Sequence, residues 1–193
     1  MSEKLEVKDL INVGIFTALY FIIMFASGML GFIPIIFLFF PLYMPIISSI
    51  PFMLFLTKVK KFGMVTIMSV IIGFLMFATG HTWVTLVVTI ICGFFADLIF
   101  KAGKYQSFKH TVLGYSIFSF WLMGAMLPLW IMRDSYFAYI RENMGDEYAN
   151  AIFTMTPVWI AYVMVGVIFI AGIIGAFFGK AILKKHFKRA GIL

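Results

Sequence analysis

The stretch from Leu10 to Thr57 contains no charged residue. It is too long for a single crossing of a bilayer, because about 20 helical residues span the hydrocarbon core. The stretch must therefore turn back once, and the cluster of Gly28, Gly31 and Pro34 predicts that turn. A membrane β-barrel would instead show short segments of alternating polarity. The run alone thus predicts a helical membrane protein.

Similar apolar runs follow along the rest of the 193-residue chain. The chain is 63% hydrophobic and 12% charged, whereas about a quarter of the residues in a soluble domain are charged. We predict an all-α integral membrane protein in which residues 1–193 form a single transmembrane domain. The six predicted helices cover residues 8–27, 35–56, 62–78, 83–100, 111–132 and 156–179, and an outer loop covers residues 133–155. Three prolines in the second helix predict a kink or a break there, namely Pro41, Pro45 and Pro51.

The distribution of basic residues predicts the orientation of this bundle. Six helices place both termini on one side of the membrane, and positive charge marks the cytoplasmic side. That side would hold 13 of the 15 basic residues, namely Lys4, Lys8, Lys58, Lys60, Lys61, Lys101, Lys104, Lys109, Lys180, Lys184, Lys185, Lys188 and Arg189. We therefore expect both termini in the cytoplasm and a multi-pass protein in the plasma membrane. The net charge of +7 is then explained by topology and lipid contact, without a nucleic-acid partner.

The sequence contains no set of residues that is typical of an enzyme. Cys92 is the single cysteine, and the sequence lacks both a His-Glu-x-x-His motif and a phosphate-binding glycine loop with a lysine. Ser116 follows Gly114 and Tyr115, but no histidine is available as its base. We therefore expect no catalysis, no metal ion and no cofactor. Asp97 and Lys101 lie four residues apart, which favours an ion pair at a helix end over a coupling-ion site.

Three outer elements are predicted to converge at one end of the bundle: the turn at residues 28–34, the turn at residues 80–82 and the loop at residues 133–155. The loop is amphipathic enough for a short interfacial helix ended by Gly145, and we interpret it as a lid. Aromatic and polar residues near this end suit a flat heteroaromatic ligand with hydroxyl groups. The candidate substrate-binding residues are His81, Trp83, Trp121, Arg133, Tyr148, Asn150 and Trp159. The alternative for the aromatic residues is the interfacial belt of any membrane protein.

Small residues recur at four-residue spacing on two predicted helices. Gly14 and Ala18 form one such face, and Gly175 and Gly179 belong to another. Small residues let helices approach closely. These faces predict either packing within the bundle or docking of another membrane subunit.

The opening Lys-Asp-Leu-Ile-Asn-Val-Gly-Ile-Phe-Thr-Ala-Leu-Tyr, together with six helices and an outward pocket, resembles the substrate-binding S components of energy-coupling factor (ECF) transporters. The resemblance is greatest to the group known as Trep_Strep. It implies a vitamin bound in the outer half of the bundle under closing loops. It also implies docking to a membrane coupling protein, the T component, which carries two cytoplasmic ATPase subunits. The family's helix 1 motif is Ala-x-x-x-Ala, and this chain has Gly14 and Ala18 at that spacing.

From these features we predict the S component of an ECF vitamin importer that does not itself hydrolyse ATP. The expected cargo is a small hydroxylated heteroaromatic molecule, such as a B6 vitamer or a hydroxymethylpyrimidine. The alternatives are a small membrane-embedded enzyme and a non-catalytic membrane assembly subunit.

Overall fold

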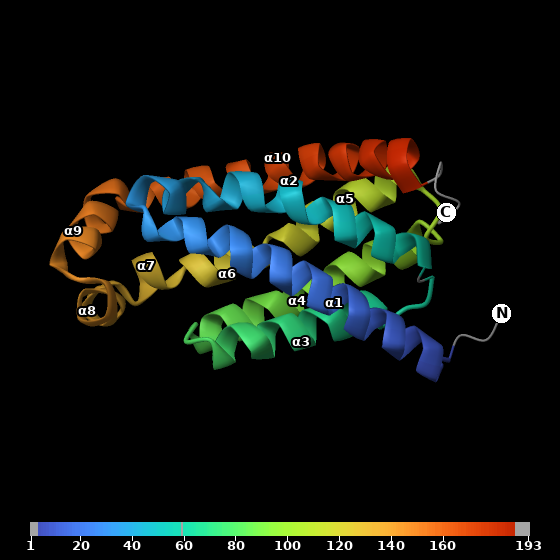
Figure 1. The fold of residues 1–193 in the computed structure, drawn as a ribbon, viewed down its shortest axis with the longest axis horizontal. Coiled ribbons are helices and arrows are strands. Elements are labelled where there is room, and N and C mark those ends of the chain that lie inside the picture. Colours follow the sequence, from blue (N-terminus) through green and yellow to red (C-terminus); the bar gives the residue numbers. More distant parts are fainter. Residues whose placement is uncertain (1–3, 59, 188–193) are drawn as a thin grey trace.

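The computed structural model describes residues 4–58 and 60–187 and shows long helices that run side by side (Figure 1). Within these residues the chain is helical and forms no strand. Five helical segments are long and apolar enough to cross a membrane, and a shorter apolar helix accompanies them. The predicted fold class, an all-α integral membrane protein, is confirmed.

The long helices follow the apolar runs of the sequence because a helix satisfies its own backbone polar groups in lipid. Their bounds are α1 (Val7–Gly28), which continues into the 3₁₀ turn η1 (Met29–Phe32), α2 (Pro34–Lys58), α4 (Trp83–Ala102) and α10 (Val158–Ile182), which continues into the π-helical turn η2 (Leu183–Phe187). The shorter helix is α3 (Met64–Ala78). In Figure 1, α10 lies beside α2, and α3 beside α4. α2 continues through its three internal prolines, so the structure contains no break there.

The segment predicted as one helix over residues 111–132 consists of three helices. These are α5 (Phe108–Ser119), α6 (Trp121–Met126) and α7 (Pro128–Ile131). At the first interruption, the backbone N–H of Phe120 donates to the carbonyl of Ile117, which tightens the turn. Pro128 begins α7, where the missing N–H of proline has no cost. This arrangement brings short helical pieces into the outer half of the bundle.

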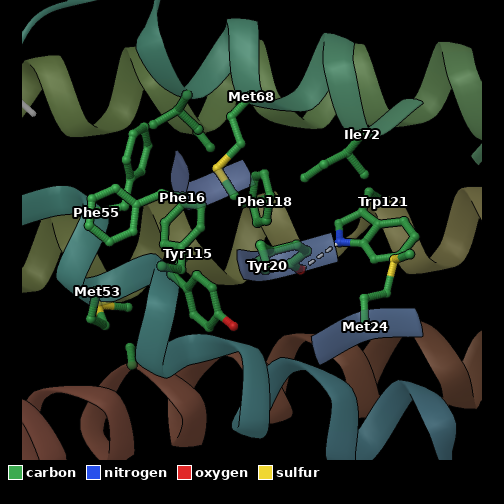
Figure 2. Close-up of a cluster of buried hydrophobic side chains, with 14 of the residues drawn as sticks. Phe16, Tyr20, Met24, Met53, Phe55, Met68, Ile72, Tyr115, Phe118 and Trp121 are labelled. Atoms are coloured by element: carbon green, nitrogen blue, oxygen red, sulfur yellow. Dashed lines mark hydrogen bonds between the residues drawn. The ribbon is translucent and has the colours of Figure 1, made fainter. Parts of the chain in front are cut away.

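Aromatic side chains fill the centre of the bundle (Figure 2). The indole Nε1 of Trp121 donates a 2.9 Å hydrogen bond to the hydroxyl of Tyr20, and both side chains are buried. The ring of Tyr20 meets the ring of Phe118 edge to face at a centroid distance of 5.6 Å. α1 is thereby joined to α5 and α6 by both packing and a hydrogen bond.

At the end of the bundle where α1 begins, a buried carboxylate holds α3 in place. Asp97 of α4 accepts hydrogen bonds from the backbone N–H of Gly63 at 2.8 Å and from both the N–H and the hydroxyl of Thr66. It also accepts one from the hydroxyl of Tyr105 at 3.3 Å. Lys101 lies instead over the ring of Phe62, 5.0 Å from its centroid. The expected pair between Asp97 and Lys101 is therefore replaced by capping of the α3 N-terminus.

The opposite end, which we call the outer end, is covered by two helices. α8 (Arg133–Met144) and α9 (Asp146–Met155) are joined at Gly145, whose φ of 86° is accessible to glycine at little cost. Figure 1 shows both helices at the end of the bundle away from the start of α1. The stretch expected to be a loop with one interfacial helix is thus a helical hairpin.

Candidate ligand-binding site

A cavity of about 250 Å³ lies beneath this cover at the outer end. Its walls come from the ends of α1, η1, α2 and α3, from the α3–α4 turn, and from α6 and α8. The lining residues are Met24, Phe25, Gly28, Met29, Gly31, Phe32, Phe37, Phe40, Met76, Thr79, His81, Leu122, Ala125, Met126 and Tyr136. The three outer elements predicted to converge therefore do meet around one cavity.

His81 is the cavity residue with the clearest unmet hydrogen-bonding capacity. Its backbone N–H donates to the carbonyl of Met76 at 3.1 Å, which fixes the turn after α3. Its ring Nδ1 is buried without a hydrogen-bond partner among the described residues, as is the hydroxyl of the neighbouring Thr82. Burial lowers the pKa of His81 below its ordinary value of 6.5, so the imidazole is neutral at pH 7. A buried polar atom of this kind is costly unless a ligand or water completes it.

Tyr136 of α8 lines the same cavity from the covering hairpin. Burial raises the pKa of its phenol, so the hydroxyl keeps its proton. Its ring stacks on that of Tyr139 at a centroid distance of 6.4 Å. Tyr136 and His81 thus supply a neutral hydroxyl and a neutral imidazole to an otherwise largely apolar wall. Such a wall with a few polar groups is typical of small-molecule sites.

Arg133 is engaged where the covering hairpin meets α7 and α10, and it does not line the cavity. Its guanidinium donates to the carbonyls of Leu129, Phe153 and Thr156 at 2.9–3.2 Å. It also lies over the ring of Phe153, 4.0 Å from the centroid. The structure therefore does not bring Arg133, which was predicted to bind substrate, to the cavity wall; the residue holds α8 against the end of α9.

Tyr148 and Asn150 lie on α9 outside the cavity wall. The hydroxyl of Tyr148 donates a 2.6 Å hydrogen bond to the carbonyl of Gly31, which itself lines the cavity. The amide oxygen of exposed Asn150 accepts from Arg141 at 3.0 Å. Tyr148 therefore joins α9 to a residue of the cavity rim, whereas Asn150 links α9 to α8 within the hairpin.

The three tryptophans named from the sequence do not converge on the cavity. Trp83 and Trp159 are each 61% exposed at the ends of α4 and α10. Trp121 is fully buried in the central cluster, where its indole is bonded to Tyr20 (Figure 2). The alternative of an interfacial belt and internal packing fits these three residues better than contact with a ligand.

The two small-residue faces differ in their surroundings. A side chain at Gly175 would meet the carbonyl of Pro45 at 2.5 Å, and one at Gly179 would meet the carbonyl of Ser49 at 2.9 Å. Of the two predicted alternatives, packing within the bundle therefore describes Gly175 and Gly179, because both pack against α2. Gly14 and Ala18 are exposed, and a Cβ added at Gly14 would meet nothing within 4 Å.

The apolar part of the wall could not be identified from the sequence. Met24, Phe37 and Met126 line the cavity, but the same residue types also fill the core. The one available signal was the cluster of Gly28 and Gly31, which predicted the turn at the mouth. Tyr136 lies in the predicted outer loop with several other tyrosines, and nothing in the sequence indicates that its side chain faces the cavity.

Comparison with known proteins relates the whole bundle to one family. The model of a hypothetical bacterial integral membrane protein family, Trep_Strep, matches residues 7–189. No curated protein and no solved structure matches the sequence.

Proposed function

This chain belongs to the Trep_Strep family of hypothetical bacterial integral membrane proteins, and we propose that it is the substrate-binding S component of an ECF-type vitamin importer. The observation that carries this proposal is the cavity at the outer end, whose largely apolar wall includes His81 and Tyr136. A ligand seated there would lie against the side chains of His81 and Tyr136. The covering hairpin would separate the ligand from the exterior.

The cargo that suits this cavity is a small hydroxylated heteroaromatic molecule, such as a B6 vitamer or a hydroxymethylpyrimidine. A cavity of about 250 Å³ is near the lower end of the range for small-molecule sites, which favours a single ring. Phe37 and Phe40 offer aromatic surface, and His81 and Tyr136 offer hydrogen bonds to ring substituents. These groups bind and orient a ring but supply no nucleophile beside a base, which favours binding over turnover.

The proposed partners are a membrane coupling protein and two cytoplasmic ATPase subunits. The sequence has no phosphate-binding loop with a lysine, so the energy for uptake would come from such partners. Gly14 and Ala18 lie on an exposed face of α1 together with Ile11 and Ile15. Because small residues permit close helix contact, this face is the proposed docking surface.

Co-purification from the native membrane tests this proposal. An affinity-tagged chain should bring down a coupling protein and two ATPases, and should release its bound ligand unchanged on denaturation. Gly14→Leu should abolish the co-purification. Gly166→Leu is the matched control, because Gly166 is an equally open glycine on α10. Formation of a product from the bound ligand would overturn the importer function in favour of an enzyme.

A further inference from the structure

We propose that the outer cavity accepts its ligand only as an uncharged ring and excludes phosphorylated and carboxylated forms of the same ring. This inference rests on the proposed binding role of the cavity. It adds a chemical selection that the importer function does not require.

The wall of the cavity carries no charge. None of its lining side chains, within the part of the chain that the structure describes, belongs to lysine, arginine, aspartate or glutamate. Its polar side chains come from Thr79, His81 and Tyr136. The hydroxyl of Thr79 already donates to the carbonyl of Met76 at 2.9 Å. A phosphate or carboxylate brought into this wall would lose its hydration without gaining a cation, which is strongly unfavourable.

Arg133 is the more buried of the two arginines in the covering hairpin, and its guanidinium already has partners within the protein. This guanidinium donates hydrogen bonds to three backbone carbonyls and lies over the rings of Phe137 and Phe153. Turning it towards the cavity would remove three hydrogen bonds at the junction of α7, α9 and α10, and the carbonyl of Thr156 would keep only the bond from the indole of Trp130. Arg141 is exposed and bonded to Asn150 and Asp146. Neither arginine is therefore placed to receive an anion in the cavity.

The remaining polar groups match the edge of a neutral heteroaromatic ring. A neutral imidazole accepts at one ring nitrogen and donates at the other, and a phenol does both through its hydroxyl. His81 and Tyr136 reach the cavity from different elements, the α3–α4 turn and α8. A ring that bears a hydroxyl or amino substituent and a ring nitrogen would satisfy both groups.

Binding of matched ligand pairs to the purified full chain in lipid nanodiscs tests the inference. The probes are hydroxymethylpyrimidine and its phosphate ester, and pyridoxine and its phosphate ester, each titrated by calorimetry. We expect the neutral member of at least one pair to bind about 100-fold or more tightly than its ester. Ala125→Lys, which adds a cation to the wall, should reduce the ratio of the neutral probe's affinity to that of its ester. Trp159→Lys, which adds the same charge outside the wall, should leave it unchanged.

The outcomes separate the two proposals. If a phosphate ester binds as tightly as its uncharged parent ring or more tightly, the proposed preference for uncharged rings is wrong, whereas the importer function is unaffected. Failure of every probe to bind would also reject the inference, because it would show that the ligand class is wrong. The importer function then still depends on whether the coupling protein and ATPases co-purify. If the uncharged probe binds more tightly than its ester but the chain does not co-purify with those subunits, the preference for uncharged rings stands and the importer function is rejected.

Discussion

The hydroxyl of Tyr148 donates a 2.6 Å hydrogen bond to the backbone carbonyl of Gly31. The two residues are 117 positions apart in the chain, and Gly31 lines the outer cavity. This bond is therefore a direct link between the covering hairpin and the turn between α1 and α2 at the cavity rim.

Tyr148→Phe should loosen the cover without changing the cavity wall. A hydrogen bond of this kind contributes about 0.5–1.5 kcal/mol, so we expect ligand release to be about 2–10-fold faster. Stopped-flow measurement of dissociation checks this. Tyr162→Phe, on the exposed face of α10, is the control and should leave the rate unchanged. An unchanged rate in Tyr148→Phe would show that the bond does not restrain the cover.

The bond between Tyr20 and Trp121 should couple the stability of α1 to that of α6. Tyr20→Phe leaves the buried indole N–H without its partner. The single variants Tyr20→Phe and Trp121→Phe and the double variant form a thermodynamic cycle. We expect a coupling free energy of about 0.5–2 kcal/mol in unfolding, since interhelical bonds in membranes lie in this range. Additive effects would contradict the role of this bond.

Gly175→Ala should destabilise the bundle because the added methyl group would meet the carbonyl of Pro45 at 2.5 Å. Overpacking of this kind costs about 1–3 kcal/mol. Gly166→Ala on the same helix has open space around it and should not destabilise the protein. Thermal unfolding in one detergent compares the two variants. Equal midpoints would show that α2 and α10 can separate at little cost.

Ligand binding should weaken at acidic pH through His81. Burial holds the pKa of His81 below 6.5 in the folded protein, so the neutral imidazole is the favoured folded form. The stability that this form supplies is present above pH 6.5 and is lost as pH falls through the lowered pKa. Binding should therefore be constant above pH 6.5 and weaken as the pH falls through the folded pKa of His81, which lies below 6.5. His81→Gln should remove the fall; its persistence would assign it to another group.

The membrane fold could be predicted from the sequence because bilayer thickness imposes a length on each apolar run. The charge-free stretch between Leu10 and Thr57 contains both α1 and α2, and the turn falls at the predicted glycines. The interruption at Phe120 carried no signal, since neither glycine nor proline lies at that position. The structure shows it as a tightened turn, in which the N–H of Phe120 donates to the carbonyl of Ile117.

The candidate site was predicted only in part, for a similar reason. His81 was identifiable because it is a titratable group in a short turn between two apolar helices. Arg133 and Trp159 have residue types that suit a ligand, but the direction of a side chain depends on its neighbours. Arg133 donates hydrogen bonds to three backbone carbonyls around the hairpin, and Trp159 lies on an exposed face. Composition alone cannot separate these outcomes from contact with a ligand.

Mass spectrometry of the molecule released from the purified protein on denaturation tests the central claim most directly. The wild-type chain and Trp159→Ala should release the same small, uncharged, hydroxylated ring compound at similar occupancy, whereas His81→Ala should release little or none. Release of the same compound at full occupancy from His81→Ala would contradict the assignment of the outer cavity as its binding site.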